Sequence, residues 1–307
     1  MSVKIYTDAG SNLFKEILAK RGVEIIVLPM TLTVNDKEYH CYSDDIDVAS
    51  MSKDFYMEMR NGSHPKTSLP SPGLFEELAK KDVANGDRVL FVTLSSGISG
   101  TFQSASLIAS QINEAEGKEA VAVLDSKTAG FGEGMIALKA ASLSKEGLNL
   151  SEIKEQTEEY VKKVRSEFTV DSIKYLANSG RVSALTAKIA DVLMIKPLLY
   201  GSDEGKIVVT AKVPGRKNAL KHLVSQLLEH ISDKNSLVYI AHCDAEMEAK
   251  NVEKELHENG VTNTEVYYYD LVTGAHVGPG TIALFYEGKD RSVEKKGVLS
   301  SLLPKKH

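Results

Sequence analysis

In the first half of the chain, apolar and polar positions alternate between two patterns, one typical of strands and one typical of helices. Short apolar runs such as Val89 to Leu94 predict buried strands, and the stretches that follow repeat apolar residues every three or four positions, as a helix requires. One such stretch, 101–113, places five apolar residues on a single face: Phe102, Ala105, Ile108, Ala109 and Ile112. Strand and helix recur in order at 3–6 and 13–20, 89–94 and 101–113, and 121–124 and 134–144. This alternation is typical of parallel βαβ units.

The pattern changes near residue 165. Strands are predicted at 168–170, 198–200, 207–213, 237–241, 264–269 and 281–286, and helices at 172–178, 184–193, 219–231 and 246–259. Within the first part, strands at 24–28 and 31–34 with a turn at 35–37, and a helix at 73–80 capped by Ser71, interrupt the βαβ order. We therefore predict an α/β protein of two domains. Residues 1–165 form a Rossmann-like βαβ domain with a parallel sheet, and residues 166–307 form an α+β domain.

Composition narrows the classes of function. The 307 residues exceed one typical core, and a net charge of −5 with a pI near 6.0 argues against nucleic-acid binding. The apolar runs are too short to cross a membrane, and Met1 to Ile5 leads directly into a strand, so we expect a cytoplasmic protein without an integral membrane segment. Cys41 and Cys243 are far apart in the sequence and are expected to be reduced, incidental thiols.

Three polar loops carry the candidate chemistry: 67–72, 95–101 and 274–280. The middle loop joins a predicted strand to the N-terminus of a predicted helix. Free backbone N–H groups and the positive end of the helix dipole favour an anion at such a position. Hydroxyls and a histidine on these loops therefore suggest a carboxylate or phosphate ligand.

Other motifs are better explained by structure. The segment 201–207 lacks the glycine spacing and the following helix of a phosphate loop, and is predicted to be a hairpin turn. The segment 130–134 lacks the third glycine of a dinucleotide fingerprint, which leaves a loop with close helix packing. Asp8 and Asp125 are expected to cap helices or form turns. No histidine spacing indicates a metal, and no cofactor motif is present.

Seven segments form a further pattern along the chain: 7–13, 67–72, 95–101, 125–127, 175–182, 196–197 and 275–280. Taken together, in this order, they resemble the DegV family of bacterial fatty-acid-binding proteins. The resemblance implies a two-domain α/β protein that holds one long-chain fatty acid between its domains, without a cofactor. It also implies a possible partner, since some members present the fatty-acid carboxylate to a separate ATP-dependent kinase subunit. That kinase makes acyl phosphate for phospholipid synthesis.

The resemblance also assigns roles to residues. Thr67 and Ser99 match the hydroxyls that bind the carboxylate, and His276 matches the histidine beside it, which we expect to be partly charged and to orient the ligand rather than act as a catalytic base. Arg181 matches the arginine of a Gly-Gly-Arg loop. Further residues expected near the site or facing a partner are Ser96, Ser126 and Arg216.

The chain departs from the family pattern at two positions. Ser179 replaces the first glycine of the Gly-Gly-Arg loop, and Pro214 stands where the family often has an arginine associated with the kinase reaction. Arg216 is the nearby candidate to replace that arginine.

The alternative is a serine hydrolase acting on a lipid ester. Ser99 or Ser96 would be the nucleophile and His276 the base, with Asp8 or Asp125 as the acidic member. This alternative is less favoured because glycine directly follows Ser99, so that the G-x-S-x-G elbow is missing.

Overall fold

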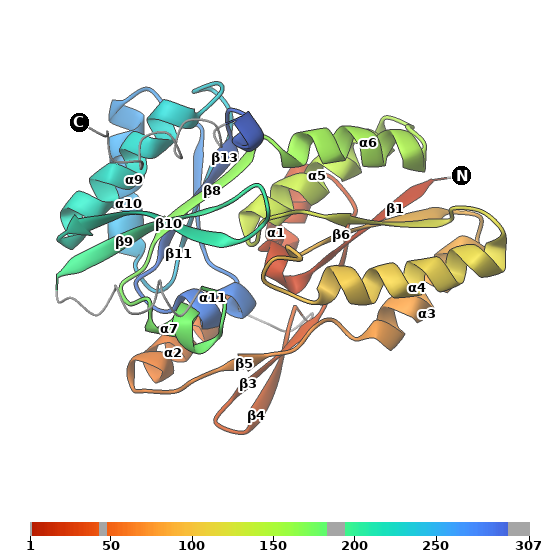
Figure 1. The fold of residues 1–307 in the computed structure, drawn as a ribbon, viewed down its shortest axis with the longest axis horizontal. Coiled ribbons are helices and arrows are strands. Elements are labelled where there is room, and N and C mark those ends of the chain that lie inside the picture. Colours follow the sequence, from red (N-terminus) through yellow and green to blue (C-terminus); the bar gives the residue numbers. More distant parts are fainter. Residues whose placement is uncertain (1, 43–47, 183–193, 294–307) are drawn as a thin grey trace, which may run out of the picture.

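The computed structural model describes residues 2–42, 48–182 and 194–293. The helix predicted at 184–193 lies outside these residues. Two sheets dominate the molecule, one in each half of the chain (Figure 1). We refer to residues 2–163 as the N-terminal half and residues 164–293 as the C-terminal half. Among the described residues, no helix is long and apolar enough to cross a membrane.

The N-terminal sheet is parallel, as the alternating pattern predicts. Its strands lie in the order β2 (Ile26–Leu28), β1 (Val3–Asp8), β6 (Arg88–Thr93) and β7 (Val121–Asp125). Helices α3 (Pro72–Ala84) and α4 (Thr101–Glu116) pack on one face. Helices α1 (Lys15–Arg21), α5 (Phe131–Lys145) and α6 (Leu150–Val161) pack on the other. The two-sided cover explains the continuous apolar runs within β6 and β7.

The C-terminal sheet is mixed. Its order is β10 (Ile207–Pro214), β9 (Ile195–Gly201), β8 (Val164–Thr169), β13 (Ile282–Glu287), β11 (Val238–His242) and β12 (Thr264–Tyr268). Only the β11–β12 pair is parallel among these described strands. Helices α9 (Arg216–His230) and α10 (Glu246–Glu258) cover one face. The predicted domain boundary between residues 165 and 166 falls inside β8 and stays a prediction.

Smaller elements from both halves lie beside the two large sheets. Strands β3 (Met30–Val34), β4 (Lys37–Cys41) and β5 (Lys66–Thr67) form an antiparallel sheet, and Asn35 and Asp36 make the β3–β4 turn with positive φ angles, as tight hairpins require. Helices α2 (Val48–Arg60), α7 (Lys174–Asn178) and α11 (Leu271–Val277) lie close to this small sheet (Figure 1). Two 3₁₀ turns, η1 (Ala9–Ser11) and η2 (Arg291–Val293), complete the fold.

The prediction of a loop at 130–134 is wrong, because α5 already begins at Phe131. The close packing inferred from its glycines is present: a Cβ on Gly132 would lie 2.4 Å from Thr128 Oγ1, and one on Gly134 would lie 2.5 Å from the Ser11 carbonyl. The glycines therefore bring a helix, rather than a loop, against its neighbours.

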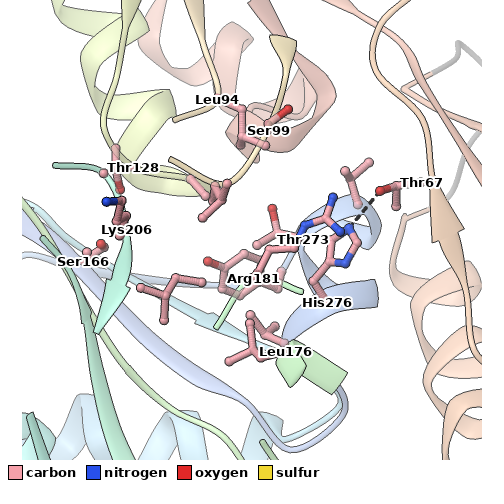
Figure 2. Close-up of a pocket in the computed structure, with 18 of the residues that line it drawn as sticks. Thr67, Leu94, Ser99, Thr128, Ser166, Leu176, Arg181, Lys206, Thr273 and His276 are labelled. Atoms are coloured by element: carbon pink, nitrogen blue, oxygen red, sulfur yellow. Dashed lines mark hydrogen bonds between the residues drawn. The ribbon is translucent and has the colours of Figure 1, made fainter. Parts of the chain in front are cut away.

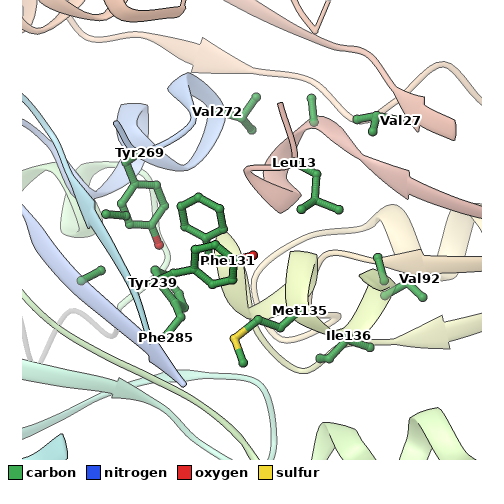
Figure 3. Packing of buried hydrophobic residues seen from close by; sticks show 14 of the residues in the cluster. Leu13, Val27, Val92, Phe131, Met135, Ile136, Tyr239, Tyr269, Val272 and Phe285 are labelled. Atoms are coloured by element: carbon green, nitrogen blue, oxygen red, sulfur yellow. The ribbon is translucent and has the colours of Figure 1, made fainter. Parts of the chain in front are cut away.

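One hydrophobic core joins the two halves. The ring of Phe131 from α5 stacks on Tyr239 from β11, with centroids 4.2 Å apart and an angle of 1° between the planes (Figure 3). The same cluster continues through Phe285 of β13 and Val272 of α11. Any site at the junction therefore has walls whose relative position is fixed by shared packing.

Candidate functional site

A pocket lies at the junction of the two halves (Figure 2). It contains about 820 Å³ of space, counting solvent at its mouth. Its apolar lining comes from both halves: Met30, Leu69, Leu94, Ile98, Ala129, Phe168, Leu176, Ile207, Tyr269, Val272, Val277 and Phe285. The described polar side chains that line it are Thr67, Ser68, Ser99, Lys127, Thr128, Ser166, Arg181, Lys206, Thr273 and His276.

The charge of this lining has one sign. Lys127, Arg181 and Lys206 contribute cations, whereas no aspartate or glutamate occurs among the described lining residues. Lys127 is already paired with Asp125 at 2.7 Å, and Lys206 with Glu204 at 3.4 Å, so their charges are partly compensated. An apolar cavity with cationic groups and no acidic side chain favours an amphiphilic anion.

Thr67 and His276 meet at one end of the pocket. Thr67 ends the short edge strand β5, and His276 lies in the last turn of α11, whose first turn is capped by Asp270 accepting from the Thr273 N–H. The Thr67 hydroxyl and His276 Nε2 are 2.8 Å apart. The structure thus brings together two residues separated by 209 positions, as their proposed shared role requires.

Burial determines the charge of His276. It lowers the pKa of the imidazole from 6.5 to about 4, and the nearby positive charge of Arg181 acts in the same direction. The ring is therefore neutral at neutral pH. The expectation of a partly charged histidine concerned the ring beside a bound carboxylate and stays a prediction. Its Nδ1 is buried without a hydrogen-bond partner among the described residues, so the neutral ring retains capacity for a ligand.

Ser99 lines the same pocket from the loop before α4. Its hydroxyl lies 2.9 Å from Thr101 Oγ1 and accepts a 3.3 Å hydrogen bond from the Thr101 N–H. Gly100, the N-cap of α4, offers no side-chain cap, and the helix start carries a partial positive charge. Ser99 is thus a pocket-lining residue just before a helix N-terminus.

Arg181 also reaches the pocket, from the segment after α7. Its guanidinium donates to the Ser179 carbonyl, and burial lowers its pKa from the ordinary value. Figure 2 shows Arg181 beside Thr273 and His276. The position predicted from the Gly-Gly-Arg resemblance is therefore in the pocket lining.

The remaining predicted residues have other contacts and do not line this pocket. The Ser96 N–H donates to Asp125, and its hydroxyl accepts from Lys127 at 3.4 Å. Ser126 is fully buried and donates to the Thr128 carbonyl. Arg216 forms a 2.6 Å ion pair with Glu248 and donates to the Gly280 carbonyl. Their roles near a partner stay predictions.

These contacts do not form the Ser–His–Asp arrangement that the hydrolase alternative requires. The hydroxyl of Ser99 contacts Thr101, and the imidazole Nε2 contacts Thr67. The side chain of Asp8 instead accepts from the Gly10 and Leu94 backbone N–H groups, which confirms its capping role. Neither candidate serine is hydrogen-bonded to His276 in the described part of the chain.

Sequence reasoning missed several lining residues. Lys206 lies in the predicted hairpin turn, and Thr128 and Ser166 lie in elements assigned no site role. Local sequence carries little signal for them, because they reach one cavity only when the two halves of the chain pack together. Lys127 also lines the pocket and lies in the segment 125–127 that resembles the family, so the motif could have indicated it.

Comparison with known proteins adds independent evidence. A family model described as uncharacterised protein, DegV family, matches residues 2–289. A DegV domain-containing protein of Clostridium perfringens is 32% identical over 286 residues, which cover 92% of this chain and 97% of the relative.

Solved structures resemble the whole fold. A DegV family protein from Thermus thermophilus described by its fatty-acid binding is 26% identical with a TM-score of 0.80, covering 94% of this chain and 100% of the other. A fatty-acid-binding DegV family protein from Streptococcus agalactiae is 26% identical with a TM-score of 0.82 and the same coverage. DegV from Bacillus subtilis, described as a fatty acid binding protein, is 29% identical with a TM-score of 0.77, again with coverage of 94% and 100%.

Proposed function

This chain belongs to the DegV family, and from that membership and the pocket we propose that it binds a long-chain fatty acid. The observation that carries the proposal is the lining itself: apolar side chains from both halves, cationic groups, and no acidic side chain among the described lining residues. Several of the solved structures that it resembles are described as fatty-acid-binding proteins.

We place the carboxylate of the ligand at Thr67, Ser99 and His276. Hydroxyls donate to a carboxylate oxygen, and the neutral imidazole donates through whichever nitrogen carries its proton. The charge of Arg181 and the N-terminus of α4 offset the cost of removing the anion from water. These groups bind the carboxylate without a metal.

The acyl tail supplies most of the binding energy. About fifteen buried carbons at ~0.8 kcal/mol each give roughly 12 kcal/mol gross, against about 1.5 to 3 kcal/mol for each charge-assisted hydrogen bond at the head. Affinity is therefore set mainly by the tail, and orientation by the head group.

The carboxylate end lies beside an exposed loop, which suits transfer to a partner. Ser68 is exposed and Leu69 is 39% exposed, and both also line the pocket. We propose that a separate ATP-dependent kinase subunit, in the cytoplasm, reaches the head group from this side. The carboxylate oxygen then forms a bond to the γ-phosphorus of ATP as the bond to ADP breaks, which yields acyl phosphate.

Mass spectrometry tests the lipid proposal directly. Native spectra and an organic extract of the purified protein should show a long-chain monocarboxylic acid at one per chain. Palmitate or oleate added to delipidated protein at about one hundred times its dissociation constant should add about 2.7 kcal/mol of stability. Bare protein together with an unchanged thermal midpoint would contradict the proposal.

The kinase step needs a separate assay. His276→Ala should retain the lipid, because the tail supplies most of the affinity, but should lose phosphorylation in a reconstituted reaction with the kinase subunit. Turnover equal to that of the wild type would contradict the placement of His276 at the reacting head group.

A further inference from the structure

One wall of the pocket is a hairpin turn that belongs to the C-terminal half of the chain. The β9–β10 turn, residues 201–206, contributes Gly201, Gly205 and Lys206 to the lining. Figure 1 shows this turn extending from the C-terminal sheet to the N-terminal half. In Figure 2, Lys206 lies on the side of the pocket away from Thr67 and His276, so the turn bounds the region proposed for the acyl tail.

The turn is attached to the N-terminal half through a side-chain hydrogen bond and a close approach of two backbones. The Ser95 hydroxyl is buried and donates a 2.7 Å hydrogen bond to the Gly205 carbonyl. Gly205 has a φ of +75°, and a Cβ there would lie 2.1 Å from Ser95 Oγ. On the facing loop, a Cβ on Gly97 would lie 2.4 Å from the Gly205 carbonyl oxygen. Glycine at both positions allows two backbones to meet where side chains would separate them.

The buried side chain of Arg291 also holds the β9–β10 turn in place. Arg291, in η2, is 5% exposed, and its guanidinium donates to the Gly201 and Ser202 carbonyls at 3.2 and 3.3 Å. It also donates to the Lys127 carbonyl at 3.4 Å and to the Val161 carbonyl at 2.7 Å, both in the N-terminal half. Burial lowers the pKa of Arg291 to about 10, so it remains a cation at neutral pH. One side chain thus bonds carbonyls on both sides of the junction.

We propose that Ser95 and Arg291 are positioning residues for the ligand: they hold the β9–β10 turn closed as the wall over the acyl tail, and thereby set the rate at which the lipid leaves. Neither residue is among the described residues that line the pocket, so they act through the turn and not by contact with the lipid. The inference rests on the proposed fatty-acid binding. It predicts that weakening the attachment accelerates lipid release while leaving the contacts of Thr67 and His276 with the carboxylate intact, because these two residues lie at the other end of the pocket.

Stopped-flow fluorescence tests this inference. The protein is loaded with cis-parinaric acid, a fluorescent fatty acid, and mixed with excess unlabelled oleate, so that the decay of fluorescence gives the release rate. Ser95→Ala removes the buried hydrogen bond to the Gly205 carbonyl, together with the one that the Ser95 hydroxyl accepts from the Gly97 N–H. It should release the probe about tenfold faster. Arg291→Lys should also accelerate release, because a lysine cannot donate to four carbonyls at once.

Thr169→Val is the matched control. The Thr169 hydroxyl is fully buried and donates a 2.9 Å hydrogen bond to the Pro197 carbonyl, but it joins β8 to β9 within one sheet. Thr169 is not among the described lining residues. This variant should lose a similar amount of stability and keep the wild-type release rate.

The outcomes separate the two proposals. Wild-type protein that binds no parinaric acid overturns the proposed function and this inference with it. Binding in the wild type, with Ser95→Ala and Thr169→Val releasing the probe equally fast, overturns only the inference.

Hydrogen exchange on the wild type provides a second measurement that needs no variant. The Gly205 N–H donates to the Ser202 carbonyl and the Ser202 N–H to the Lys206 carbonyl. These amides should exchange more slowly in lipid-loaded than in delipidated protein, and equal exchange would contradict a wall that opens for the ligand.

Discussion

The neutral state of His276 predicts a specific dependence of stability on pH. Burial lowers its pKa from 6.5 to about 4 in the folded protein, whereas the unfolded chain has the ordinary value. As the pH falls below 6.5, the unfolded chain takes up a proton that the folded protein excludes, so this residue destabilises the fold at acid pH. Above pH 6.5 its effect disappears, because the ring is neutral in both states.

The size of the effect follows from those two values. Between about pH 7.5 and about pH 5, the linkage relation gives a loss of about 2 kcal/mol in the free energy of unfolding from this residue alone. Buried carboxyl groups work in the opposite direction, since burial raises the pKa of Asp8 to about 6 and that of Asp270 to about 8. Their stabilising contribution is present at low pH and is lost as the pH rises through those values. The contribution of His276 to the pH dependence is therefore obtained by comparing the wild type with a variant that lacks the imidazole.

Urea unfolding of delipidated protein at the two pH values provides the assay, with His276→Gln as the non-titrating variant. The wild type should lose about 2 kcal/mol more than His276→Gln on going from the higher to the lower pH. The carboxyl contributions cancel because both proteins contain them. Parallel pH profiles, within about 0.5 kcal/mol, would refute the neutral, buried imidazole on which the site is built.

Two further predictions concern the head group and the shared core. Thr67→Val and Ser99→Ala should each weaken binding of a fatty acid more than binding of its methyl ester, as measured by titration calorimetry. In a double-mutant cycle, their effects on fatty-acid affinity should be non-additive. Equal losses for acid and ester would place the carboxylate elsewhere. Phe131→Ala should cost about 3–5 kcal/mol in urea unfolding, because it removes a fully buried ring that stacks on Tyr239, and a loss below 1 kcal/mol would contradict a core continuous between the halves.

Sequence alone predicted the elements whose signals are local. The strand at 89–94 followed by the helix from Thr101 appears as β6 and α4, because an apolar run and a helical repeat adjoin in sequence. Helix α6 was missed although its signal was readable: Asn149 and Glu152 form a capping box, and Ile153 and Val161 face the core.

Other features could not be predicted from the residues adjacent to them in the sequence. The prediction of a polar loop at 274–280 is wrong for its first residues, because Gly274 to Val277 belong to α11. A Cβ on Gly274 would lie 2.0 Å from the Tyr56 hydroxyl. That glycine is required by a residue 218 positions earlier in the sequence, which no local pattern reveals. The pairing of Thr67 with His276 was predicted only through family resemblance, since spacing carries no information about contacts between distant loops.

The hydrogen bonds of Arg291 to residues much earlier in the sequence affect how the protein folds during synthesis. This arginine bonds the Gly201 carbonyl, 90 positions earlier, and the Val161 carbonyl, 130 positions earlier. A chain emerging from the ribosome folds its N-terminal segments first, so Phe131 is synthesised long before Tyr239 can cover it. Until the ribosome has passed residue 291, the nascent protein has an exposed aromatic surface and an unfinished pocket wall. We expect this interval to be when the nascent chain depends most on chaperones.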